Sequence, residues 1–118
     1  MILIEVKGDP PNKQLAAHKR NVTQFRQELS KIQINELNSE TVRSPVSIEV
    51  NLYTSKLRLV RKGHDNTYIG DLDNLLSGIL DELQGRIIDD DSQVMEIKAK
   101  KNIIDDEENT RYSVLIQW

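Results

Sequence analysis

The chain has no cysteine, which excludes disulfide bonds and thiolate metal sites. Its two histidines, His18 and His64, stand in unrelated contexts, so we expect neither a histidine-based zinc site nor a serine–histidine triad. The patterns Gly-x-Gly-x-x-Gly and Gly-x-x-x-x-Gly-Lys do not occur, which leaves nucleotide cofactors without support. Carboxylates and lysines are the chemical groups in ample supply.

Long apolar runs are also lacking. No window approaches the roughly 18 continuous apolar residues that a membrane span needs. Residues 1–6 are too few and too charged for a signal peptide. We therefore expect a cytoplasmic protein without a membrane partner. A length of 118 residues fits one domain over residues 1–118.

The charges are divided unevenly along the chain. Residues 1–63 carry 11 Lys or Arg against 6 Asp or Glu, a net charge of +5. Residues 64–118 carry 5 against 13, a net charge of −8, so the whole chain has −3. A uniformly acidic protein would repel nucleic acid, whereas a basic half beside an acidic site is compatible with binding it. Ordinary surface charge segregated by chance would give the same numbers.

Alternation of apolar and polar residues predicts strands, with residues 57–60 as an optional extension of the sheet. The predicted strands cover residues 2–6, 46–53, 94–101 and 112–118. Residues 105–109 should form a hairpin loop between the last two strands.

Apolar residues at three- and four-residue spacing predict two helices, over residues 14–37 and 75–84. The resulting order is β-α-β-(β)-α-β-β. Because several strands have one polar face, we expect an α+β fold: a two-layer sandwich in which a mixed β-sheet has its helices packed on one face.

Two acidic clusters, at residues 71–74 and 89–93, flank the shorter predicted helix. A helix of that length can place carboxylates from both clusters around one point. Hard divalent cations such as Mg²⁺ prefer all-oxygen surroundings, and a phosphodiester nuclease needs such a site. Taken separately, Asp71 or Asp73 could cap the helix, and the Asp89–Asp91 run could be a solvated turn of a structural dimer. An EF-hand is excluded, because its obligatory glycine would fall at Leu76 or Val94.

Three segments together form a distinctive pattern: Tyr-Ile-Gly-Asp-Leu-Asp-Asn-Leu-Leu at 68–76, Leu-Asp-Glu-Leu at 80–83 and Asp-Asp-Ser-Gln-Val at 90–94. They resemble the RusA family of Holliday junction resolvases. The Gly-Asp-Pro-Pro-Asn-Lys segment at 8–13 also resembles that family's N-terminal Pro-Pro turn. The resemblance is specific over residues 68–98 and rests on element order elsewhere.

The resemblance implies a homodimeric, Mg²⁺-dependent endonuclease, with Mn²⁺ as an alternative metal, that resolves four-way DNA junctions by paired nicks in recombination or repair. Asp71, Asp73 and Asp91 match the family's catalytic, metal-binding aspartates. Asp90 matches the neighbouring acidic position of the metal site, and Asp89 is expected to be solvated. Two-fold symmetry would let a dimer address two opposing DNA strands with identical sites.

Ser77 stands where the family has a catalytic lysine. A lysine beside the metal would stabilise developing negative charge, a contribution on the order of 10²–10³ in rate, and serine cannot supply that charge. Either another cation substitutes, or the protein is a catalytically degenerate junction-binding protein. Lys98 and Lys100 are the candidate replacements, with Lys101 and Arg86 as further candidates.

Binding to DNA phosphates needs clustered cations, and the chain offers them near the Pro-Pro turn and after the second strand. An aromatic residue close to the first acidic cluster is a candidate for stacking on a base. The alternative for the basic residues is solubilising charge on an edge strand and loop. The predicted DNA-binding residues are Lys13, Lys19, Arg20, Lys56, Arg58, Arg61, Lys62 and Tyr68.

Overall fold

The computed structural model describes residues 1–59 and 70–118. The helices and strands in these two ranges are β1 (Ile2–Lys7), α1 (His18–Leu37), β2 (Val46–Thr54), α2 (Leu72–Leu83), β3 (Val94–Ile103) and β4 (Arg111–Gln117). Short 3₁₀ turns lie at Lys56–Arg58, Asp91–Gln93 and Glu107–Asn109. Neither described helix has the length and apolar character to cross a membrane.

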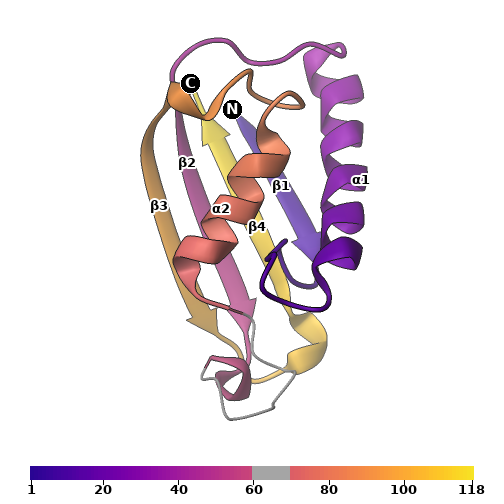
Figure 1. Ribbon diagram of the computed structural model, residues 1–118, viewed down its shortest axis with the longest axis vertical. Helices are drawn as coiled ribbons and strands as arrows, with labels where there is room; N and C mark the ends of the chain where they lie inside the picture. The colour runs from indigo at the N-terminus through magenta and orange to yellow at the C-terminus, as the bar shows by residue number, and fades with distance from the viewer. Residues whose placement is uncertain (60–69) are drawn as a thin grey trace.

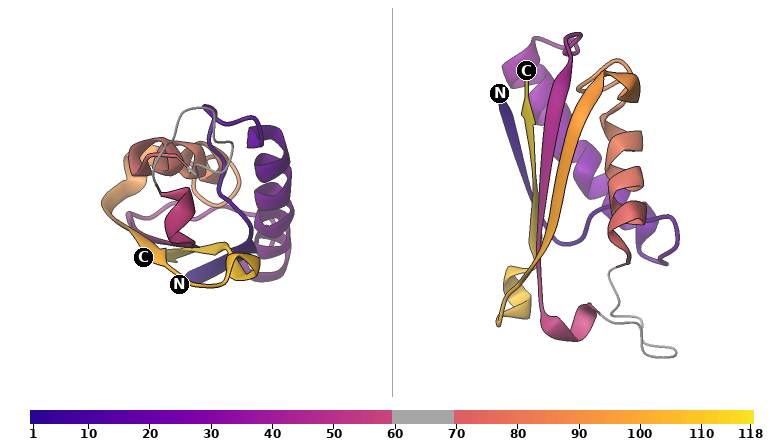
Figure 2. Two further views of the ribbon diagram at one scale, coloured as in Figure 1. Left: turned by 90° about the horizontal axis from the view of Figure 1, so that it is seen from below. Right: turned by 90° about the vertical axis from the view of Figure 1, so that its left-hand side faces the viewer.

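The four strands form one mixed sheet in the order β1-β4-β2-β3. β4 runs antiparallel to both of its neighbours, whereas β2 and β3 are parallel. Both helices cover the same face of this sheet (Figures 1 and 2). The predicted α+β sandwich, with a mixed sheet and helices on one face, is therefore confirmed.

Two local predictions fail. β3 and β4 do not pair, because β2 lies between them, so residues 105–109 connect two separated strands rather than a hairpin. Alternation marks a strand equally well whatever its neighbour is, which is why the sequence did not reveal this. The optional strand at 57–60 is replaced by the Lys56–Arg58 turn, as far as the described residues extend.

The core lies between the helices and the inner face of the sheet. α1 contributes Phe25 and Leu29, and α2 contributes Leu75, Ile79 and Leu83, all fully buried. Phe25 meets Tyr112 of β4 edge to face, with ring centroids 5.7 Å apart. This apolar stripe on α2 leaves Asp73, Ser77 and Asp81, at four-residue steps, exposed on its outer side.

The turn that follows β1 packs along α2, and two glycines make the close approach possible. A Cβ atom at Gly78 would lie 2.2 Å from the carbonyl oxygen of Pro11. Gly70, just before α2, has φ +104°, and a Cβ there would lie 2.0 Å from the side-chain nitrogen of Asn12. The Asn74 amide also donates to Gln14 at 2.9 Å. The Pro-Pro turn therefore fixes where the first acidic cluster sits.

Gly78→Ala should lower the free energy of unfolding by about 1–3 kcal/mol, because the new methyl group would press on the Pro11 backbone. Urea unfolding measures this. Ser77→Ala is the matched control: its side chain is exposed on the same helix, so the change should stay within about 0.5 kcal/mol. Equal stabilities of the two variants would contradict tight packing of the turn on α2.

Candidate functional site

The first acidic cluster lies at the start of α2. Asp71 occupies the N-cap position with an extended backbone, but its side chain forms no capping hydrogen bond. Asp73 lies in the first helical turn, and both side chains are exposed. The positive end of the helix dipole favours carboxylates at this place. The alternative in which the Asp71 side chain only caps the helix is therefore not supported.

The second cluster lies beyond the end of α2, at the turn that leads into β3. Gln93 holds this turn together: its Oε1 accepts from the backbone N–H groups of Asp89 and Asp90, each at 2.8 Å. Its Nε2 donates to the carbonyl oxygens of Val42 at 2.8 Å and Ser44 at 3.0 Å. The glutamine of the Asp-Asp-Ser-Gln-Val segment is thus a positioning residue that ties the aspartates to the loop before β2.

The three aspartates of this run have different surroundings. Asp90 accepts hydrogen bonds from the hydroxyl of Ser92 and, at 2.6 Å, from the amide of Gln84. The Ser92 hydroxyl is the main reason that the pKa of Asp90 lies below its ordinary value, and the backbone N–H groups of Ser92 and Asp91 and the Gln84 amide contribute as well. Asp90 therefore shapes the turn.

The carboxylates of Asp89 and Asp91 differ in whether they have partners among the described residues. Asp89 accepts from the Thr41 hydroxyl and lies 3.5 Å from Nε of Arg43, so it is exposed but engaged, not simply solvated as expected. The exposed carboxylate of Asp91 forms no hydrogen bond or ion pair with the described residues. Of the three, Asp91 is the aspartate whose oxygens are not used to hold the turn.

The structure does not bring the two clusters together within one chain. α2 has 12 residues, so its ends are about 18 Å apart. Asp71 and Asp73 stand at one end and Asp90 and Asp91 at the other (Figure 1). In the described ranges no group of three or more His, Asp or Glu side chains is close enough to hold a metal. The expectation that this helix would place both clusters around one point is therefore wrong for a single chain. The spacing in the sequence did not account for the rise of the helix, which holds the clusters apart.

Three of the four candidate lysine replacements do not lie at the start of α2. Lys98 and Lys100 of β3 are level with Glu49 and Asn51 of β2, on the face away from the helices. Lys98 lies 3.6 Å from Glu96 in an exposed pair. Arg86 is bound to Glu82, both to its carboxylate at 3.3 Å and to its carbonyl oxygen at 3.1 Å. None of these three is placed beside Asp71 and Asp73.

The fourth candidate, Lys101, reaches the start of α2. Lys101 of β3 is level with Leu52 of β2, on the face that the helices cover. Its ammonium group donates to the carbonyl oxygen of Gly70 at 2.7 Å. Gly70 immediately precedes Asp71, so a cation from β3 reaches the start of α2. The alternation of β3 carried this signal, because position 101 continues the inner row of Ile97 and Ala99.

Three of the predicted DNA-binding residues that the structure describes lie at the end of the molecule where α2 begins. Lys19 and Arg20 lie in the first turn of α1, and Lys56 lies in the 3₁₀ turn after β2; all three are exposed (Figure 1). Lys13 lies 3.1 Å from Asp81 on the outer side of α2. Arg61, Lys62 and Tyr68 fall outside the described residues.

Arg58 has a structural partner. Its guanidinium group binds the carboxylate of Asp9 through two hydrogen bonds, at 2.8 and 2.5 Å, and both side chains are largely buried. These hydrogen bonds are the main reason that the pKa of Arg58 is raised. Arg58 therefore holds the turn after β1 in place, and Arg20, at the rim of a hollow of about 470 Å³ beside this pair, is the more accessible cation.

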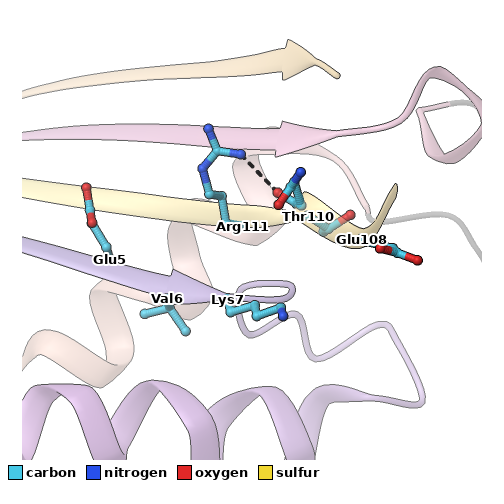
Figure 3. Close-up of a pocket in the computed structure, with 7 residues that line it drawn as sticks. Glu5, Val6, Lys7, Glu108, Thr110 and Arg111 are labelled. Atoms are coloured by element: carbon cyan, nitrogen blue, oxygen red, sulfur yellow. Dashed lines mark hydrogen bonds between the residues drawn. The ribbon is translucent and has the colours of Figure 1, made fainter. Parts of the chain in front are cut away.

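Another hollow, of about 260 Å³, lies at the ends of β1 and β4 (Figure 3). It is lined by Glu5, Lys7, Glu108 and Arg111, among others, and the Arg111 guanidinium donates to the carbonyl oxygen of Asn109 at 3.0 Å. None of the predicted site residues lines it. It is a feature of the strand ends and not part of the acidic site.

A comparison with protein families found a match over nearly the whole chain. The family model described as endodeoxyribonuclease RusA matches residues 10–117. This range includes both acidic clusters, Lys101 and most of the Pro-Pro turn. A search of curated proteins found no match.

Gln93→Ala should lower the free energy of unfolding by about 1–3 kcal/mol, because two backbone N–H groups and two carbonyl groups lose their partner. Chemical denaturation measures the loss. Gln27→Ala, at an exposed site on α1, is the control and should change stability little. A loss no larger than the control's would show that Gln93 does not organise the turn.

Proposed function

The chain belongs to the RusA family of endodeoxyribonucleases, and from this membership we propose that it resolves four-way DNA junctions by paired, metal-dependent nicks. The observation that carries the proposal is the pair of exposed carboxylates at the start of α2, Asp71 and Asp73. The basic first turn of α1 and the Lys56 turn lie at the same end of the molecule. An acidic pair with cations around it suits a site that cuts a polyanion.

The donor set fits Mg²⁺, with Mn²⁺ as a substitute. Both donors are carboxylate oxygens, and Mg²⁺ is commonly held by one or two carboxylates, with water and substrate phosphate completing its shell. When bound, the cation would polarise the scissile phosphate and lower the pKa of an attacking water. Asp71 and Asp73 would hold it, and the helix dipole at the start of α2 would favour the same negative charges.

The remaining residues of this end orient the DNA. Lys19, Arg20 and Lys56 are exposed and would contact backbone phosphates, which carry no sequence information. Such contacts suit an enzyme that recognises the shape of a junction. Arg58 acts indirectly, by holding the turn after β1 through Asp9.

We further propose that the site is completed across a two-fold axis. Asp91 lies about 18 Å along α2 from Asp71 and Asp73, too far to share their cation. A two-fold axis beside α2 would set two copies of the helix antiparallel, which brings the start of one near the end of the other. The partner subunit's Asp91 would then join Asp71 and Asp73, and a dimer would carry two such sites.

Ser77 favours one alternative function, that of a junction-binding protein with little cleavage. Its exposed side chain lies one helical turn after Asp73 and carries no charge. The two functions differ in one measurement, since both predict junction binding but only the first predicts cleavage.

Incubating the protein with a four-way junction and Mg²⁺ should give symmetric nicks. Asp71→Asn should slow cleavage by at least about 100-fold, since it removes a metal-binding carboxylate while leaving the helix start intact. Asp105→Asn, an exposed aspartate in the loop before β4, is the control and should cleave like wild type. Junction binding without cleavage by wild type would support the degenerate protein instead.

Mixing two inactive variants tests the shared site. In a heterodimer of Asp71→Asn and Asp91→Asn subunits, one composite site carries both substitutions and the other carries neither. The mixture should therefore regain single nicks but not paired cuts. If each chain built its own site, both sites of the heterodimer would be defective, and the mixture would stay inactive after subunit exchange is verified.

A further inference from the structure

The end of β3 places a cation at the start of α2. Lys101 is partly buried, and its ammonium group lies 2.7 Å from the carbonyl oxygen of Gly70. Gly70 has a positive φ that disfavours a side chain, and an added Cβ would meet the Asn12 side chain. Lys101 therefore reaches the backbone one residue before the first predicted metal ligand.

The position of Lys101 in the sheet is unusual for a lysine. The inner face of β2, to which it is paired, is apolar at Ile48, Val50 and Leu52. Extending a lysine from this row costs side-chain entropy and partial desolvation of the ammonium group. Its neighbours on the strand, Lys100 and Asn102, are level with Asn51 and Tyr53 on the other face. Among the described lysines of β3, Lys101 alone points toward α2.

We propose that Lys101 supplies the positive charge that the family's lysine would supply from position 77. The inference rests on the proposed function, because it assigns a role within the same site. A lysine is a compact point charge on a flexible four-carbon stem, so a small rotation carries the ammonium group from the Gly70 carbonyl toward a phosphate beside Asp71. Charge at that place stabilises the negative charge that develops on the phosphate during cleavage.

A purely structural role for Lys101 makes different predictions. If it only anchors Gly70, its loss would loosen the start of α2 and weaken cation binding. If it acts as a charge, its loss removes a repulsion between the ammonium group and a bound cation, and cation binding becomes tighter. The two roles thus change the same affinity in opposite directions.

The first measurement is calorimetric titration of the full-length protein with Mn²⁺ in the absence of DNA. Lys101→Met keeps the length of the side chain and removes the charge, and it should tighten Mn²⁺ binding by about threefold or more. Lys100→Met is the matched control, because Lys100 lies on the opposite face of the sheet, and it should leave the affinity unchanged. Weaker Mn²⁺ binding by Lys101→Met, or none by wild type, overturns the proposal.

The second measurement is junction cleavage with Mg²⁺. Lys101→Met should slow cleavage by about 100-fold, and adding Ser77→Lys to this variant should restore most of the rate, because it returns a lysine to the family's position. Lys101→Arg should keep much of the activity. Failure of Ser77→Lys to rescue a folded Lys101→Met variant contradicts the charge role. If wild type does not cleave, the proposed function fails. The Mn²⁺ affinities still show whether Lys101 acts as a charge at the site or only as a structural anchor.

Discussion

The parallel pairing of β2 with β3 is the constraint on which the site depends. Two parallel neighbours cannot be joined by a short turn, so the chain must run back along the sheet before β3 begins. α2 makes this return, and its apolar stripe covers the inner face as it does so. The crossover separates the two acidic clusters by the length of the helix. It also returns the end of β3 to the start of α2, so that Lys101, ten residues after Asp91, lies closer to Asp71 than Asp91 does.

A second constraint, the packing of the turn after β1, determines where α2 starts. The turn fits against the helix only because Gly78 and Gly70 have no side chains. The buried pair of Arg58 and Asp9 holds the other side of the same turn. Breaking one partner of such a pair leaves a poorly solvated charge, so the pair specifies the turn more than it stabilises the whole fold. The cations of the basic half thus divide into Arg58, which holds the turn, and exposed cations, which are the proposed contacts to DNA.

The sequence predicted the elements and the layer architecture, because burial on one face imposes a period of two on strands and 3.6 on helices. It did not predict which strands pair, since alternation is the same for any neighbour; hence the hairpin expected at residues 105–109 is absent. The family resemblance predicted Asp71, Asp73 and Asp91 as one set. It did not predict that α2 separates the first two from the third within one chain, because a linear pattern does not contain the direction of the helix. The sequence showed Gln93 only as one residue of the motif. Its role could not be predicted, because two of its four hydrogen bonds are to Val42 and Ser44, which are distant in the sequence.

Lys101 was one of the candidate replacements, and the strand pattern already separates it from Lys98 and Lys100. The alternation that placed Lys98 and Lys100 on the outer face also places position 101 on the inner face, two residues after Ala99. A lysine in an apolar row is costly unless a partner receives it, and that cost is itself a signal of function. Here the partner is the backbone at the start of α2. Under the proposed role of Lys101, the missing charge at position 77 and the charge at position 101 would have one explanation: the strand that faces the helix would supply the cation in place of the helix.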